Sequence, residues 1–397
     1  MPRRILYSKY SYPQAGEIGM FGKLIRGQHC LRALLYASSL TLLGALIAAE
    51  ADESASSKSG ESIGLVLTDW RYALYQTPAV EECSLGLQKG AVDQFKAQAD
   101  PLGHFKQFGG TFETRGPNGE DPNFSPMLVT DPLPFSELKT HVGFGFNLDG
   151  TSDGRATSHT LAHEKFLSPD GERVDNQLAR VVGCIQGWRK TGFMAEFYAK
   201  EVETSPINRH LIEITGVHDE QNDPDVEVFI YKGRDRLVRN ASGSFIPFMS
   251  HRIDERFPQF MLKTHGKIVD GVLVTDPIPF ARLPLVQIQM TGERDIRDLR
   301  LRLKLTATGA DGLLGGYEQL DSWWNNHSKS PGSDPGQYSP AGVYRALYRY
   351  GDGYPDAATG KPTAISVAYQ VSAVRALIVH PAHRAPGVVV AQADQQQ

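Results

Sequence analysis

The sequence predicts a mostly β fold, an antiparallel β-sandwich or jelly-roll-like arrangement with a few helical insertions. Many short stretches alternate apolar and polar residues, and they are separated by segments rich in glycine and proline. The regular alternation of strands and helices that a parallel sheet requires is missing. The most regular stretch, Leu299–Leu305, places leucine on one face and arginine or lysine on the other. Such a strand fits a sheet with one solvated side.

The first 51 residues predict a secretory signal peptide. Lys23, Arg26 and Arg32 precede an almost unbroken apolar run at 33–48, and Ala49-Glu50-Ala51 resembles a cleavage site. A retained membrane anchor is the alternative, but the apolar run is short for a spanning helix. The sequence therefore predicts export to the periplasm or the extracellular space.

Removal of this peptide would make the chain more acidic than its formal net charge of −4, because the peptide is basic. An acidic chain repels phosphate backbones, which disfavours a nucleic-acid partner. No later stretch is long and apolar enough to predict a membrane span after signal cleavage.

The three cysteines predict one disulfide. Cys30 lies within the predicted signal peptide, which leaves Cys83 and Cys184 as a pair in an oxidising compartment. The alternative is two separate buried thiols. A bridge would close a loop of about 100 residues, for which the chain-entropy model gives about 4–5 kcal/mol of stabilisation.

Local patterns predict the elements in order along the chain. A polar tether is expected at 52–62, helical spacing at 85–97 and loops at 101–126. A strand at 141–148, an Asp- and His-rich loop and a helix-like segment at 174–188 follow. The expected later strands are 192–200, 209–216, 226–232, 260–267, 267–274, 286–290, 299–306 and 365–380, with helices at 317–324 and 341–350.

An internal repeat predicts two related halves. The octapeptide LVTDPLPF at 128–135 recurs as LVTDPIPF at 273–280 with one residue changed. Each proline keeps the preceding residue extended, so the repeat indicates architecture rather than chemistry. It suggests an N-terminal β-rich domain at 63–240, a C-terminal one at 241–385 and a disordered tail at 386–397.

Acidic and amide residues in the loop after 146 form a candidate calcium site. Asn147, Asp149, Asp153 and Asp170 offer the oxygen ligands that calcium prefers, and neighbouring glycines allow tight turns. The spacing is not that of an EF-hand. The alternative is ordinary turn chemistry, since Asp-Gly and Asn are common turn residues.

Two histidines in the same loop form a candidate zinc site. His159 and His163 are four residues apart, and a third ligand could come from His141 or Asp175. If the loop is catalytic, His163 is the candidate base and Glu164 or Asp175 would orient it. The alternative is a pair of solvated loop histidines.

Aromatic residues near the C-terminal end form a candidate ligand surface. Trp323, Trp324, Tyr344 and Tyr348 could offer exposed rings to sugar faces. The alternative is that these rings are part of the core, because aromatic side chains bury large areas.

These patterns leave three functions open. The first is binding of a carbohydrate, another extracellular polymer or a small molecule; the second is a metal-dependent hydrolase that uses the 149–176 loop. The third is a structural protein of the cell envelope. C-x-x-C, G-x-G-x-x-G and P-loop patterns do not occur, so the sequence carries no nucleotide, flavin or haem signal, and calcium is the one cofactor suggested.

Overall fold

The computed structural model describes residues 60–78, 80–88, 115–130, 134–287, 290–328 and 338–381. The predicted signal peptide, the predicted C-terminal tail and most of the helix expected at 85–97 lie outside these residues. Strand β1 begins at Glu61, so the last two residues of the predicted tether belong to the sheet.

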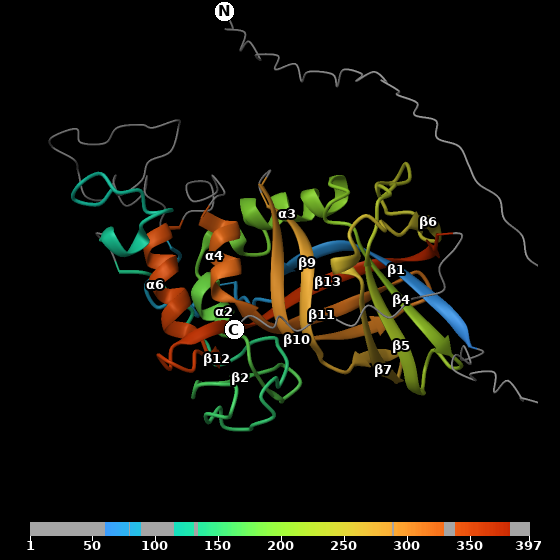
Figure 1. Ribbon diagram of the computed structural model, residues 1–397, viewed down its shortest axis with the longest axis horizontal. Coiled ribbons are helices and arrows are strands. Elements are labelled where there is room, and N and C mark those ends of the chain that lie inside the picture. Colours follow the sequence, from blue (N-terminus) through green and yellow to red (C-terminus); the bar gives the residue numbers. More distant parts are fainter. Residues whose placement is uncertain are drawn as a thin grey trace, which may run out of the picture. The chain divides into compact units, whose positions relative to one another are not determined.

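Eight strands form a closed antiparallel barrel (Figure 1). Neighbours follow the order β1-β4-β5-β7-β8-β10-β11-β13, and β13 pairs back onto β1. The predicted mostly β, antiparallel fold is confirmed, but the sheet closes on itself and does not form the two facing layers of a sandwich. The strands are β1 (Glu61–Tyr72), β4 (His210–Val217), β5 (Asp223–Lys232), β7 (Leu262–Val269), β8 (Val272–Thr275), β10 (Met290–Leu305), β11 (Gly309–Gln319) and β13 (Pro362–Val379).

The remaining strands pair with barrel strands or with each other. β9 (Ile278–Gln287) pairs with β10, while β6 (Met249–Arg252) and β12 (Gly353–Pro355) pair with β13, and β2 (Phe166–Leu167) pairs with β3 (Arg173–Val174). The helices are η1 (Pro126–Leu128), α2 (Gln177–Val182), η2 (Gln186–Trp188), α3 (Phe193–Thr204), η3 (Pro258–Phe260), α4 (Leu320–Ser328) and α6 (Pro340–Tyr350). Within the described ranges, no helix has the length and apolar character needed to cross a membrane.

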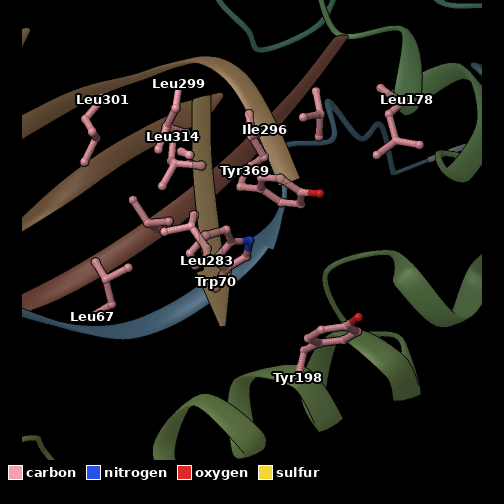
Figure 2. Packing of buried hydrophobic residues seen from close by; sticks show 14 of the residues in the cluster. Leu67, Trp70, Leu178, Tyr198, Leu283, Ile296, Leu299, Leu301, Leu314 and Tyr369 are labelled. Atoms are coloured by element: carbon pink, nitrogen blue, oxygen red, sulfur yellow. The ribbon is translucent and has the colours of Figure 1, made fainter. Parts of the chain in front are cut away.

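Inward-facing aliphatic and aromatic residues fill the barrel. On β10, Leu299, Leu301 and Leu303 are buried, whereas the arginines and the lysine between them point outward, as the alternating sequence predicts. Figure 2 shows Leu299 and Leu301 pointing into the same space as Leu67 of β1 and Leu314 of β11. The barrel interior is therefore a packed hydrophobic core.

Residues 193–204 form a helix, so the strand expected at 192–200 is wrong. Met194, Tyr198 and Val202 are buried at four-residue intervals, which is the spacing of one helix face. That face packs on β1, and Figure 2 shows Tyr198 on the side of α3 that faces Trp70. Tertiary packing of this face overrides the short local alternation.

The barrel takes strands from both sides of the boundary expected near residue 240. β1, β4 and β5 precede it and the other barrel strands follow it, and the described residues belong to one compact unit. The second octapeptide forms β8 and the start of β9. In the first, Leu128 ends η1, and residues 131–133 lie outside the described ranges. The two copies thus differ in local structure.

The predicted disulfide between Cys83 and Cys184 is confirmed. Their Cα atoms are 5.7 Å apart, and both residues are buried in the main core. The bridge fastens the segment after β1 to the residues that follow α2.

Candidate functional site

A buried ionic cluster lies within residues 142–176 (the 142–176 segment), the part of the chain that holds the predicted calcium and zinc ligands. The ammonium of Lys165 is 2.7 Å from Asn147 Oδ1, 2.5 Å from Asp149 Oδ1 and 3.0 Å from Asp175 Oδ1. The side chains of Asp149 and Asp175 are 0% exposed and that of Lys165 is 2% exposed. Charges removed from water this completely require partners with good geometry, and each has them here.

His163 extends the cluster toward the turn after α6. Its Nε2 lies 2.8 Å from Asp175 Oδ1 and 3.7 Å from Asp352 Oδ2, while its Nδ1 is 2.9 Å from the Leu161 carbonyl. The backbone N–H of Ser366 donates to the other oxygen of Asp352 at 2.6 Å. The cluster therefore joins the 142–176 segment to β13 and to the α6–β12 turn.

Burial and neighbouring groups shift the pKa of three members of the cluster. Burial would raise the pKa of Asp149, but hydrogen bonds from Lys165 and Thr151 outweigh it and lower the pKa. Burial alone would lower the pKa of His163, but the hydrogen bond to Asp175 and the charge of Asp352 outweigh it and raise the pKa to about 9. Burial raises the pKa of Asp352 to about 6, against the opposing effect of the His163 charge. Protonated His163 and the Lys165 ammonium thus face three acidic groups, those of Asp149, Asp175 and Asp352.

This arrangement predicts a pH-dependent stability. The folded-state pKa of His163 is raised above 6.5, so its contribution is complete below pH 6.5 and is lost as the pH rises through 9. A shift of this size corresponds to about 3 kcal/mol. In urea unfolding, His163→Gln should therefore cost most at pH 6.5 and progressively less toward pH 9.5. The same cost at both ends would contradict this assignment, and His159→Gln at an exposed position should be neutral throughout.

The cluster combines residues from three sequence predictions, with Asn147 from the predicted calcium site among them. Asp149 belongs to the predicted calcium site, His163 to the zinc site and Asp175 to the catalytic group, and their ligand atoms lie within 4.8 Å of one another. Lys165 was not among the predicted site residues, yet its ammonium lies between the two aspartates. Because this ammonium already supplies a cation to the carboxylates, the geometry favours an ionic support over a metal site.

The remaining predicted metal ligands lie apart from the cluster. Asp153 is exposed and lies 4.0 Å from the Arg155 guanidinium. Asp170 is exposed and lines a groove on the barrel surface. His159 is exposed and stacks on Tyr354 with ring centroids 5.8 Å apart. Calcium and zinc stay predictions.

Glu164 also lies outside the cluster. It pairs with His141 at 2.6 Å and with Arg180 at 3.3 Å, and its side chain is 57% exposed. Of the two candidate orienters of His163, Asp175 is therefore the one in hydrogen-bond contact. The 0% exposure of Asp175 leaves this pair facing the protein interior.

An open groove of about 780 Å³, the lateral groove, crosses the outer face of the barrel beside the 142–176 segment. Its floor is built from two rows of side chains that strand register places across β1, β13, β11 and β10. The residues of one row lie opposite one another on neighbouring strands and project outward from the same face. The two rows share that face because their positions on each strand are two apart. The first row is Asp69, Ser372, Asp311 and Lys304, and the second is Arg71, Gln370, Leu313 and Arg302.

The 142–176 segment supplies one wall of the groove through Phe144 and Asp170. Arg302 holds this wall to the barrel, because its guanidinium is 3.3 Å from both Glu172 Oε2 and the Gly145 carbonyl. Arg300 donates to the Asn147 carbonyl at 3.0 Å in the same way. These two arginines hold the wall against the barrel, while the ionic cluster joins Asp149, Lys165 and Asp175 within the same segment.

Charges of both signs line the groove in equal number. Four acidic and four basic side chains surround it, and hydrogen bonds between some of them hold these side chains in place. Arg71 donates to Asp69 at 2.8 Å and to Glu196 at 3.0 Å, and Ser372 donates to Asp311 at 2.6 Å. Gln370 is exposed on the floor. The groove thus offers donors and acceptors without a strong net charge.

The predicted aromatic surface is divided between core and surface. Trp323 is 0% exposed and stacks on His327, so it belongs to the core. Trp324, Tyr344 and Tyr348 are half-buried and pack on one another, with successive ring centroids 4.9 and 4.6 Å apart. The Tyr348 hydroxyl donates to Asp321.

Comparison with known protein families, with curated proteins and with solved structures finds no match for this chain.

Proposed function

We propose that this protein is an exported binding protein whose lateral groove holds a neutral carbohydrate, as a segment of an extracellular polymer or as a shorter saccharide. The observation that carries the proposal is the groove of about 780 Å³, with its two rows of outward side chains. An open groove suits a chain that runs through it, whereas a closed pocket would admit only a chain end.

The chemistry of the lining favours a polyhydroxylated neutral ligand. Carboxylates on the floor can accept hydrogen bonds from sugar hydroxyls, and the amide and hydroxyl groups can both donate and accept. Phe144 and Val272 are half-buried and give apolar surface for the C–H faces of a sugar ring. Because the four acidic and four basic groups balance, a strongly charged polymer gains little there.

Preorganisation also supports this proposal. The floor lies on paired strands, and the side chains of Arg71, Asp69 and Asp311 are held by partners before any ligand arrives. Fixed groups lose little conformational entropy on binding. The hydrolase alternative is less favoured, since the Asp149–Lys165–Asp175 cluster is buried and turned away from solvent.

The proposal predicts a loss of binding from two floor substitutions. Purified protein would be run in affinity gels with soluble β-glucan, α-glucan and mannan, with polyanionic alginate as the charged comparison. Gln370→Ala combined with Asp311→Ala removes hydrogen-bonding groups from both rows, so affinity for the retained neutral polymer should fall about tenfold or more. Both side chains are exposed, and the melting temperature should change little.

Asp276→Ala is the matched control, because Asp276 is exposed but does not line the groove. Its affinity should equal that of the wild type. Retention of none of the neutral polymers, or equal retention of the floor double variant and the wild type, would reject the groove as the binding site.

A further inference from the structure

A small cavity lies inside the protein between helix α3 and the end of the barrel. It measures about 10 Å³ and is lined mainly by aromatic side chains and by Arg294. A space of this size admits one particle about as large as a water molecule. Figure 2 shows three of the lining residues, with Tyr198 of α3 on one side and Trp70 of β1 and Tyr369 of β13 on the other.

Four of the side chains that line this cavity carry a buried polar atom without a hydrogen-bond partner among the described residues. They are Trp70 Nε1, Trp188 Nε1, Tyr198 Oη and Arg294 Nη1. Each of the four residues is more than nine-tenths buried. They come from β1, η2, α3 and β10, which lie far apart in the sequence, so the fold gathers them.

All four groups can donate a hydrogen bond, and three of them cannot accept one. Indole N–H and guanidinium groups have no acceptor atom, whereas the tyrosine hydroxyl can act in either way. A water molecule accepts at most about two hydrogen bonds and must place two hydrogens of its own. A monatomic anion accepts from several donors at once, and the Arg294 charge favours it.

Arg294 is only partly neutralised by its nearest acid. Its Nε lies 3.5 Å from Glu318 Oε1, an oxygen that has no hydrogen-bond partner within the described ranges. The Tyr369 hydroxyl donates to the other oxygen of Glu318. Burial raises the pKa of Glu318, against the opposing effects of the Arg294 charge and the Tyr369 hydrogen bond. Arg294 Nη1 has no hydrogen-bond contact with this acid or with any other described residue.

From these contacts we infer that the cavity is a binding site for a single halide ion, held by Trp70, Trp188, Tyr198 and Arg294. The size of the cavity excludes sulfate and phosphate. An ion bound here bridges α3 to the barrel, so it stabilises the folded protein by mass action. Arg71 lines both this cavity and the lateral groove, but none of the four proposed ligands lines that groove.

The test is a series of thermal melts of the whole protein at constant ionic strength, in which sodium gluconate is replaced by sodium chloride or bromide. The melting temperature should rise with halide in a saturable way, by about 3 °C or more at 100 mM. Sodium sulfate should not produce this rise. A halide-independent melting temperature would mean that water alone fills the cavity and would overturn the inference.

Two tyrosine variants locate the effect. Tyr198→Phe removes one donor from the cavity and should weaken the apparent halide affinity about tenfold. Tyr317→Phe is the matched control, because Tyr317 is equally buried, its hydroxyl also has no partner among the described residues, and it does not line the cavity. An equal halide response of both variants and the wild type would also overturn the inference. Arg294 is not substituted, since its loss could prevent folding.

Discussion

Replacing Lys165 by Met should destabilise the folded protein by about 3–5 kcal/mol, more than almost any other single substitution in this chain. The ammonium contacts Asp149 and Asp175, and both carboxylates are 0% exposed. Without it, two buried acids of like charge must be protonated or share His163 as their one remaining cation. The measurement is urea unfolding at pH 7, compared with the wild type under the same conditions.

Lys139→Met is the control for this substitution. Lys139 pairs with Glu137 at 3.1 Å, but its side chain is 56% exposed, so the loss should be about 1 kcal/mol or less. If Lys165→Met cost no more than Lys139→Met, the cluster would not be the support of the 142–176 segment. The stability of that wall of the lateral groove would then not depend on the ionic cluster.

Removing the disulfide should have the second large effect. Cys83 and Cys184 are 101 residues apart, so the bridge restricts a long loop of the unfolded chain. The double substitution Cys83→Ala with Cys184→Ala should lower the free energy of unfolding by about 3–5 kcal/mol. Both residues are buried, and the small side chain of alanine leaves little strain at either position.

Treatment with a reductant distinguishes the stability lost with the disulfide from the stability lost with side-chain volume. Dithiothreitol should lower the unfolding midpoint of the wild type toward that of the double variant, and it should leave the double variant unchanged. A wild-type midpoint that does not move when reduction of the bridge is complete would contradict the assigned stabilisation.

Local sequence patterns predicted those parts of the fold that depend on near neighbours. The Leu299–Leu305 alternation predicted which side chains of β10 enter the core, and the cysteine count predicted the disulfide. Closure of the sheet was not predictable in this way, because it depends on pairing between β1 and β13, about 300 residues apart. For residues 193–204, a buried helical face outweighed a short alternation.

The candidate sites, too, were predictable only where residues close together in the sequence form them. The loop at 141–176 attracted attention through its residue types, and Asp149, His163 and Asp175 do meet. Lys165 was missed because a single lysine beside Phe166 has no local feature that marks it as buried. The groove floor was invisible for a stronger reason: its side chains come from strands around residues 70, 303, 312 and 371, which only the barrel brings together.

The most direct test of the proposed function is hydrogen exchange with and without a saturating neutral polysaccharide from the affinity gels. A ligand in the groove should slow amide exchange in peptides that cover 309–313 and 369–372, and in the wall around 144 and 170. Slower exchange in α4 and α6, around Trp324 and Tyr344, with no change on the groove floor would place the ligand on the aromatic surface and contradict the account.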